Sequence, residues 1–283
     1  MRLTITLWQG LSSLPRGWHS FLGNIFGELL LILFAKRKRI AKANIRVCFP
    51  LMSSKEQKKL LKQNFNCLGC SIFETGIAWF WSDQKIHKYF NYEIRGLDQL
   101  NEANSDNGNL LLFKHSQHLE LDARLLALNA SIFGVSRSHN SESMDALQTK
   151  GRLSSIQETA DKNKPRKFIK WLKEGKNVMY SIDQDYGWEN SARLKFFNQE
   201  TSTITTTSKI VDMTKCRLLF INSFYENKKL ILEIELIDSK ELDPIGLAQK
   251  INDLMEAKIL QHPAEYLWAH RRFKSTLGKK FYK

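Results

Sequence analysis

The chain has 283 residues, of which 42% are hydrophobic and 11% aromatic, so it has ample apolar side chains for a core and is not a disordered protein. Its four cysteines are too few for a disulfide-stabilised scaffold and suit a reducing compartment. The net charge of +14 is concentrated at the two ends, +7 in residues 1–46 and +6 in residues 271–283, which argues against a basic nucleic-acid-binding face spread over the fold.

The first predicted element is an apolar segment that ends in a basic cluster. Residues 3–34 contain one arginine and one acidic residue, Glu28, and Lys36-Arg37-Lys38-Arg39 follows. This order is typical of a membrane anchor whose C-terminal side faces the cytoplasm. A cleaved signal peptide is less favoured, because Glu28 interrupts the apolar stretch and no small-residue cleavage site follows. We interpret residues 1–46 as an anchor with a basic flank and residues 47–283 as one further domain.

The anchor either spans the membrane or lies on its surface. Ser20, Asn24 and Glu28 recur every four residues and would share one helical face. A spanning helix has to bury this polar stripe against protein, whereas an interfacial helix turns it to water. Gly23-x-x-x-Gly27 is a candidate surface for close helix packing. The alternative to an anchor is an amphipathic helix of an ordinary protein core.

Predicted helices and strands alternate after the anchor. A helix is expected over residues 54–80, with Ser53 and Ser54 as cap candidates and Glu56 near its first turn. Further predicted helices cover residues 119–128, 141–150, 164–173, 203–212 and 244–260. Predicted strands cover residues 109–114, 131–136 and 177–182, and a hairpin is expected from 217–225 and 229–237. This order predicts an α/β fold with a mixed sheet flanked by helices.

The residues that point to chemistry follow the strand predicted at 109–114. His115 comes directly after this apolar run, and Glu120 follows five positions later. Because ligands in α/β folds bind at the carboxyl ends of strands, we expect His115 at the mouth of a site. Glu120 is predicted to contact one imidazole nitrogen, which would fix the tautomer and raise the basicity of the other. Such a pair is suited to act as a general base on a substrate hydroxyl.

Other interpretations of these residues stay open. A His–Glu pair is often structural, and His118 could pair with Asp122 on the next helix. His115 and His118, with Cys67 and Cys70, are zinc-type ligands in a scattered pattern. The sequence contains no nucleophile elbow, no P-loop and no dinucleotide-binding glycine motif, so serine-hydrolase and nucleotide chemistry have no support.

Several segments together resemble the late acyltransferases of lipid A biosynthesis, a lauroyl/myristoyl transferase family related to the glycerolipid acyltransferases. The motif His115-x4-Glu120 is similar to the family's catalytic motif in its Glu variant. The other matching segments occur in the family's order and are Asn44–Pro50, Glu74–Trp81, Leu147–Arg152, Asp183–Gly187 and His270–Lys274. The segment Glu74–Trp81 resembles the lauroyl-transferase-like branch.

The resemblance implies the reaction and the partners. The hydroxyl of a 3-hydroxyacyl chain on the lipid A precursor would attack an acyl thioester on acyl carrier protein, with His115 taking the proton and Glu120 holding His115. No metal or redox cofactor and no nucleic acid is expected. The catalytic domain would lie on the cytoplasmic face of a bacterial inner membrane. The basic ends of the chain would then face anionic lipid, the precursor's phosphates or the acidic carrier protein.

Four further residues are predicted to bind substrate. Arg137 matches a family arginine after the second strand and would hold a lipid phosphate or the oxyanion, and Arg152 is interpreted in the same way. Asp183 and Asp185 follow the third predicted strand and would line the same mouth, with Asp183 favoured for positioning. A basic residue of the family pattern is replaced here by Ser154. The alternatives are surface salt bridges for the arginines and loop hydrogen bonds for the aspartates.

Two rival functions remain. One is an acyltransferase that acts on a glycerol phosphate or a mannoside. The other is a basic protein without enzymatic activity that binds anionic lipid or nucleic acid.

Overall fold

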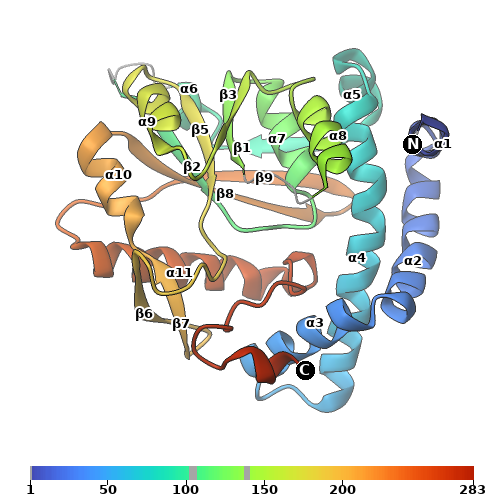
Figure 1. The fold of residues 1–283 in the computed structure, drawn as a ribbon. Helices are drawn as coiled ribbons and strands as arrows, with labels where there is room; N and C mark the ends of the chain where they lie inside the picture. Colours follow the sequence, from blue (N-terminus) through green and yellow to red (C-terminus); the bar gives the residue numbers. More distant parts are fainter. Residues whose placement is uncertain (1, 102–106, 137–140) are drawn as a thin grey trace.

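A seven-stranded sheet forms the centre of the computed structural model, which describes residues 2–101, 107–136 and 141–283 (Figure 1). Its strand order is β1-β9-β8-β2-β5-β3-β4. These strands are β1 (Tyr92–Arg95), β2 (Asn109–Phe113), β3 (Ile132–Ser136), β4 (Glu158–Asp161), β5 (Asn177–Ser181), β8 (Arg217–Glu226) and β9 (Lys229–Leu236). Only the predicted hairpin of β8 and β9 is antiparallel within this sheet, so the α/β fold with a mixed sheet is confirmed.

Helices flank the sheet, as the sequence predicted. In chain order they are α1 (Arg2–Ser12), α2 (Arg16–Leu33), α3 (Ala35–Cys48), α4 (Ser54–Phe80), α5 (Asp83–Tyr89), α6 (Asp98–Asn101), α7 (Leu119–Ala127), α8 (Glu142–Arg152), α9 (Pro165–Lys173), α10 (Thr206–Thr214) and α11 (Pro244–Gln261). Two short 3₁₀ helices, η1 (Pro263–Glu265) and η2 (Lys279–Tyr282), lie in the C-terminal segment.

Strand β2 lies at the centre of the core and is buried on both faces. Leu110 and Leu112 pack into one hydrophobic cluster with side chains of α9 and α11. Leu111 and Phe113 point the other way, into a second cluster that includes side chains of α7. This alternation is the period of two that a strand imposes, and a strand buried on both faces reads as a continuous apolar run. The core therefore fixes the end of β2, where His115 follows.

The long helix α4 runs along one side of the sheet (Figure 1). Its start is set by a capping box. The backbone N–H of Glu56 donates to the Ser53 hydroxyl at 3.3 Å, and the Ser53 N–H donates to the Glu56 carboxylate at 2.7 Å. Both contacts satisfy backbone donors that the first helical turn leaves unpaired. The predicted bounds of this helix are confirmed.

Helix α2 lies against α4 at backbone contact distance, and Figure 1 shows the two side by side. A Cβ atom added at Gly69 would lie 2.0 Å from the carbonyl oxygen of Gly23. A Cβ atom added at Gly27 would lie 2.4 Å from the carbonyl oxygen of Phe65. Only glycine fits at such distances, so the close-packing surface expected from Gly23-x-x-x-Gly27 is confirmed.

The outward side of α2 is exposed. Ser20, Asn24 and Glu28 are all exposed, as expected for one polar face of the helix, and Glu28 pairs with Lys62 of α4 at its edge. Large apolar side chains are exposed beside them, on α1 and α2: Leu3, Leu7, Leu11, Trp18, Phe21, Ile25, Leu29, Ile32 and Leu33. Within the described ranges, no single helix has both the length and the hydropathy to cross a bilayer. Helices α2 and α3 meet the test only as a pair, and this pair is bent by 96°.

A second, two-stranded sheet corrects one predicted helix. Strands β6 (Ser191–Phe196) and β7 (Gln199–Ile204) form an antiparallel hairpin, so Thr203 belongs to a strand and α10 begins only at Thr206. The turn residues Phe197 and Asn198 both have positive φ, as tight hairpin turns require. Threonine is β-branched and is common in strands, which is consistent with the place of Thr203 in β7.

Candidate active site

Two neighbouring parallel strands bring the central residues together. Phe113 of β2 is in register with Ser181 of β5. His115 and Asp183 each follow their strand by two positions, so the two side chains leave the same edge of the sheet at the same height. This edge is the carboxyl end of the parallel strands, where α/β folds bind ligands. His115 therefore lies at the predicted mouth.

The imidazole of His115 is held by Asp183. Nδ1 of His115 lies 2.5 Å from Oδ1 of Asp183, and the His115 backbone N–H donates to Oδ2 at 2.8 Å. The Asp183 side chain is 2% exposed and the His115 side chain 20%. A carboxylate only accepts hydrogen bonds, so it selects the tautomer that carries its proton on Nδ1. Nε2 of His115 is then left with its lone pair.

Electrostatics keeps Asp183 ionised in this setting. Burial disfavours the carboxylate, but His115 outweighs burial, through its charge when the ring is protonated and through its hydrogen bonds, and holds the pKa of Asp183 far below its usual range. Two further groups surround the ring. The Ser181 hydroxyl lies 3.0 Å from Nδ1, and the side-chain nitrogen of Gln184 lies 3.2 Å from Nε2. A buried carboxylate that orients an imidazole in this way can equip the histidine to accept a proton.

A cavity of about 480 Å³ opens in front of His115. Its polar wall includes His115, Glu120 and Arg152. Much of the remaining lining is apolar, with Phe113, Leu119, Val135, Ile156, Met179 and Ile204 among the side chains. Further polar side chains, with Gln148, Lys162 and Gln184 among them, also line the cavity. This mixed lining is suited to a ligand that combines polar groups with a hydrocarbon part.

The prediction that Glu120 holds His115 is wrong in this structure. Glu120 points to Arg152, whose Nε–H lies 3.1 Å from both carboxylate oxygens and whose Nη2 lies 2.5 Å from Oε1. Trp79 adds an indole N–H to Oε2 at 3.0 Å. The physical reason is competition, because Asp183 already occupies Nδ1 and the guanidinium at the end of α8 offers Glu120 a two-point, charge-assisted contact. Glu120 and Arg152 both line the cavity, and neither is confirmed as a binding residue.

Asp185 does not line the cavity, which corrects its predicted place. Asp185 is 1% exposed. Its carboxylate accepts hydrogen bonds from the Ser275 hydroxyl at 2.6 Å, the Ser275 N–H at 2.8 Å and the Gly187 N–H at 3.0 Å. It therefore ties the C-terminal segment to the loop after β5. Asp183 does not line the cavity either, because it is buried behind His115 and contacts that ring, and its predicted role toward the substrate stays a prediction. Arg137 lies outside the described residues.

The alternative pairings of the histidines are not formed. His118 turns away from Asp122 and lies between Glu74 and Glu265, while Asp122 accepts hydrogen bonds from the hydroxyls of Ser116 and Ser223. In the described part of the chain, no group of three or more His, Cys, Asp or Glu side chains is arranged to hold a metal ion. The zinc-type set of two histidines and two cysteines is thus not assembled.

Comparison with known proteins settles the family. The sequence profile of the family described as bacterial lipid A biosynthesis acyltransferase matches residues 1–275. The chain belongs to this family. The late acyltransferase resemblance of the motifs is thereby confirmed, and the protein is an acyltransferase of lipid A biosynthesis, the pathway of the lipopolysaccharide anchor. The rival interpretation as a basic protein without enzymatic activity is excluded.

Curated relatives of the acyltransferase carry matching names. It is 32% identical to the lipid A biosynthesis palmitoleoyltransferase of Escherichia coli K12 and 33% identical to the lipid A biosynthesis lauroyltransferase of the same strain, each over 90% of this chain and 84% of the relative. It is 32% identical to a lipid A biosynthesis acyltransferase of Haemophilus influenzae, over 98% of this chain and 91% of the relative. Among solved structures, the 1-acyl-sn-glycerophosphate acyltransferase PlsC of Thermotoga maritima aligns with a TM-score of 0.39 and 11% identity, over 89% of this chain and 99% of that one.

Sequence reasoning missed the true partner of His115 but had a signal for it. The three predicted strands at 109–114, 131–136 and 177–182 were expected in one sheet, and each is followed by a polar residue. Pairing the first and third strands in parallel places Asp183, and not Glu120, beside His115. Ser181 and Gln184 flank the same aspartate, and nothing in the sequence pattern distinguished them.

Proposed function

We propose that this acyltransferase moves a fatty acyl chain from acyl carrier protein to the hydroxyl of a 3-hydroxyacyl chain on the lipid A precursor, with His115 as the general base and Asp183 as the residue that orients it. The observation that carries this proposal is the 2.5 Å contact of Nδ1 of His115 with Asp183 at the mouth of the cavity. It leaves Nε2 of His115 as the atom that receives the hydroxyl proton.

The reaction proceeds in two steps in this account. Nε2 of His115 takes the proton as the acceptor oxygen attacks the thioester carbonyl, which forms a tetrahedral oxyanion. The oxyanion collapses, the carbon–sulfur bond breaks, and the leaving thiolate receives the proton from the His115 imidazolium. The new ester and the free thiol of the carrier balance the reaction. Asp183 stabilises the transient imidazolium, and general-base catalysis of this kind is worth roughly 10²–10⁴ in rate.

Glu120 serves this reaction through Arg152 in our proposal. The contacts with Glu120 use Nε and Nη2 of the guanidinium, and a guanidinium carries further N–H donors on Nη1. Because the carboxylate fixes the plane of the guanidinium in the cavity wall, Nη1 is available to an anionic group of the bound substrate. The two residues of the family's motif thus have different roles in this proposal: His115 transfers the proton, and Glu120 helps to place the substrate through Arg152.

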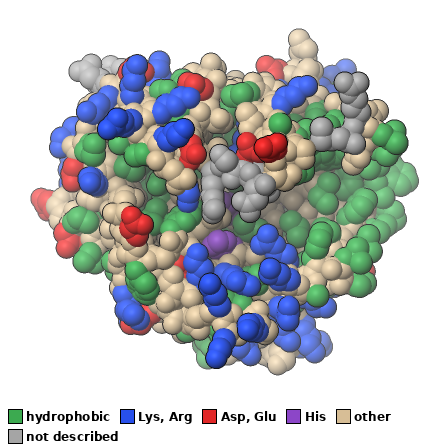
Figure 2. Space-filling view, in the orientation of Figure 1, with side chains coloured by type: hydrophobic (Ala, Val, Ile, Leu, Met, Phe, Trp, Pro, Cys, Tyr) green, Lys and Arg blue, Asp and Glu red, His purple; other side chains and the backbone are tan. Residues whose placement is uncertain are grey.

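The exposed apolar face of α1 and α2 is proposed to rest in the membrane interface. Trp18, Phe21, Ile25 and Leu29 project from α2 on the side away from α4, while Glu28 stays at the water-facing side and pairs with Lys62 at 2.8 Å. An amphipathic helix of this kind lies in the headgroup region without crossing it. In Figure 2, hydrophobic side chains cover the flank on the side of α1 and α2. This placement brings the catalytic domain to a lipid acceptor.

A basic surface beside the cavity is proposed to meet the acidic carrier protein and anionic lipid. Helix α3 and the C-terminal segment are joined by Asn44, which donates to the carbonyl oxygens of Trp268 and His270 and accepts from the Tyr282 hydroxyl. Figure 2 shows Lys and Arg side chains gathered below a hollow in which a histidine is visible. The exposed cations of these two segments are Lys36, Arg37, Lys38, Arg39, Lys42, Arg46, Lys279, Lys280 and Lys283. Such a surface attracts acidic partners and anionic headgroups.

The proposal is tested with purified full-length enzyme and lipid A precursor in detergent micelles. Lauroyl-carrier protein and lauroyl-coenzyme A are offered as alternative donors, and a glycerol phosphate acceptor is offered in parallel. We expect transfer from the carrier protein to the lipid A precursor, and a loss of at least 10²-fold in His115→Ala. Preferred transfer to glycerol phosphate, or near wild-type transfer by His115→Ala, would refute the proposal.

A further inference from the structure

The loop between β2 and α7, residues 114–118, is joined by backbone hydrogen bonds to the C-terminal segment of the chain. Ser116 forms a β-bridge with Tyr266, the Leu267 N–H donates to the carbonyl oxygen of His115 at 3.0 Å, and the Gln117 N–H donates to the carbonyl oxygen of Glu265 at 2.9 Å. The backbone of His115 is thus held on one side by Asp183 and on the other by the C-terminal segment.

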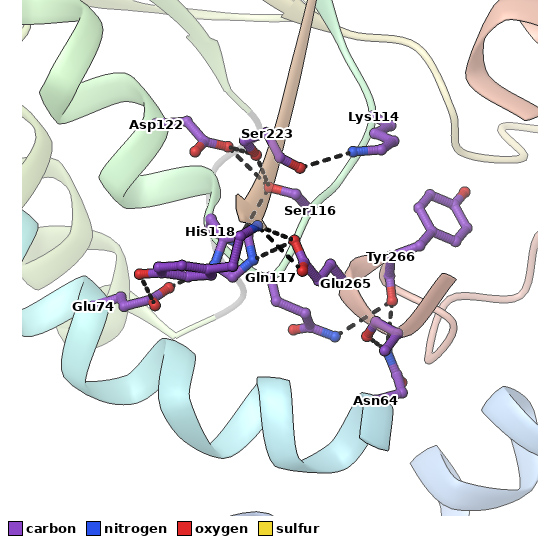
Figure 3. Close-up of polar contacts among 12 residues, drawn as sticks. Asn64, Glu74, Lys114, Ser116, Gln117, His118, Asp122, Ser223, Glu265 and Tyr266 are labelled. Atoms are coloured by element: carbon purple, nitrogen blue, oxygen red, sulfur yellow. Dashed lines mark hydrogen bonds and ion pairs between the residues drawn. The ribbon is translucent and has the colours of Figure 1, made fainter. Parts of the chain in front are cut away.

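One side chain of this loop is anchored in the protein interior. His118 is 3% exposed, with Nδ1 at 2.7 Å from Oε2 of Glu74 and Nε2 at 3.0 Å from Oε2 of Glu265 (Figure 3). Both partners are carboxylates, so both ring nitrogens donate and the ring is an imidazolium. Burial disfavours this charge, but the negative charges and hydrogen bonds of Glu74 and Glu265 have the larger effect and raise the pKa of His118 well above its ordinary value.

The contacts continue from His118 to the first residue of α2. The Tyr225 hydroxyl donates to Oε1 of Glu74 at 2.7 Å, and Nη2 of Arg16 donates to the Tyr225 oxygen at 2.7 Å. The Arg16 guanidinium also lies 4.3 Å from the centre of the Phe90 ring. Two carboxylates and two cations balance in this set. It joins α2, α4, the end of β8, the C-terminal segment and the loop that carries His115.

The position of His118 in the chain explains why its burial matters for the cavity. His115 and Glu120 both line the cavity, and His118 lies between them in sequence and faces the opposite way, into the interior. It precedes the first residue of α7 and makes no side-chain cap contact with that helix, so its ring is used for the two carboxylates. The deeply buried imidazole of His118 therefore fixes the stretch of backbone that carries His115 and Glu120.

We propose that His118, clamped between Glu74 and Glu265, is a positioning residue that holds the His115 loop in its catalytic geometry and ties that geometry to helix α2 through Tyr225 and Arg16. The inference rests on the proposed role of His115 as the base. A misplacement of a reacting group by about 1 Å costs roughly 10²-fold in rate. Loss of the clamp is thus expected to lower kcat more than it changes KM, because the cavity walls that bind substrate are otherwise intact.

The test compares His118→Gln with the matched control His87→Gln, whose histidine is exposed on α5. Full-length enzyme in detergent is measured for kcat and KM, for its unfolding midpoint, and for amide hydrogen exchange of the peptide that covers residues 113–120. We expect His118→Gln to lower kcat roughly 10- to 100-fold with KM within about twofold, and to speed exchange of this peptide. His87→Gln is expected to match the wild type in every measurement.

A purely structural role predicts a different pattern. It would lower the unfolding midpoint of His118→Gln while kcat per folded enzyme and exchange of the loop stay at wild-type values, and that result would overturn the inference. Tyr225→Phe serves if His118→Gln does not fold, because it removes one hydroxyl and keeps the ring. A lowered kcat and faster loop exchange are again expected, and wild-type values of both would overturn the inference. Amide exchange of the loop is measured without substrate, so it tests the role of His118 whether or not the proposed reaction is correct. An active His115→Ala variant would instead show that the proposed reaction is wrong.

Discussion

Nδ1 of His115 lies 2.5 Å from Oδ1 of Asp183, which is 68 positions further along the chain. Two paired strands, β2 and β5, bring these residues together, and the core fixes both strands. His115, the proposed base, is therefore oriented by a residue outside the His115-x4-Glu120 motif.

Asp183→Asn is expected to lower kcat by roughly 10²–10⁴-fold. The amide has the size of the carboxylate but offers an N–H to Nδ1, which favours the wrong tautomer of His115 and leaves its positive charge unbalanced. Steady-state kinetics with carrier-bound acyl donor measures the loss. Asp185→Asn is the matched control, since Asp185 holds Ser275 and Gly187 and not His115. It is expected to lower stability by about 1–3 kcal/mol while kcat of the folded enzyme stays near wild type. Equal kinetic losses in the two variants would contradict the assignment.

Glu120→Gln and Arg152→Gln are expected to act as one unit. Because the two side chains bind each other, either substitution removes most of what the pair contributes to kcat/KM, and the double variant loses little more. A double-mutant cycle in kcat/KM is expected to give a coupling of about 0.5–3 kcal/mol. The pH midpoint of kcat/KM should stay unchanged in Glu120→Gln, since Glu120 does not touch His115. Additive losses, or a moved midpoint, would restore the sequence interpretation of Glu120 as the partner of His115.

Asp122 is expected to make the protein less stable as pH rises. Burial raises the pKa of Asp122 from its ordinary value of 3.8 to about 6, and His118 with the hydroxyls of Ser223 and Ser116 offsets burial only in part. A raised folded-state pKa means that the stabilising contribution is full below about pH 4 and is lost as pH rises through about 6. The Asp122→Asn side chain cannot ionise. The unfolding free energy of this variant minus that of the wild type should therefore rise by about 1–3 kcal/mol between pH 4 and pH 7. A difference that stays constant with pH, measured by urea unfolding, would show that Asp122 is not held in this way.

Gly69→Ala is expected to loosen α2 from α4. The new Cβ atom would lie 2.0 Å from the carbonyl oxygen of Gly23, so one backbone has to move, at a cost of about 1–3 kcal/mol. Urea unfolding measures the loss, and limited proteolysis reports earlier cleavage within residues 1–33. Gly17→Ala is the matched control on α2, because nothing lies within 4 Å of its Cβ position. Identical unfolding midpoints for the two variants would mean that the helices do not meet as described.

The sequence predicted the fold where local patterns were strong. The capping box at Ser53 and Glu56 gave the start of α4, the apolar runs gave β2 and β5, and the alternation after Arg217 gave the β8–β9 hairpin. The short edge strands β1 and β4 and the β6–β7 hairpin were not predicted, because four residues carry little periodicity and a threonine-rich run fits a strand and a helix nearly equally well.

The site was predicted in part for a related reason. His115 could be placed because it directly follows a buried strand, and Asp183 was placed at the same mouth. The partner of His115 could not be read from spacing, because the choice between Glu120 and Asp183 depends on which strands are neighbours and where Arg152 lies. His118 appeared as a scattered metal ligand or a helix partner of Asp122, and only the packing of α4 and the C-terminal segment shows it between Glu74 and Glu265.

Mass spectrometry of lipid A shows whether His115 is the base for acyl transfer to the lipid A precursor. It is applied to a strain that lacks this gene and carries either the wild-type chain or His115→Ala at equal protein level. We expect the wild-type chain to restore one secondary acyl group, whose mass also gives the chain length, and His115→Ala to leave that group absent. Restoration of the acyl group by His115→Ala would show that His115 is not the base.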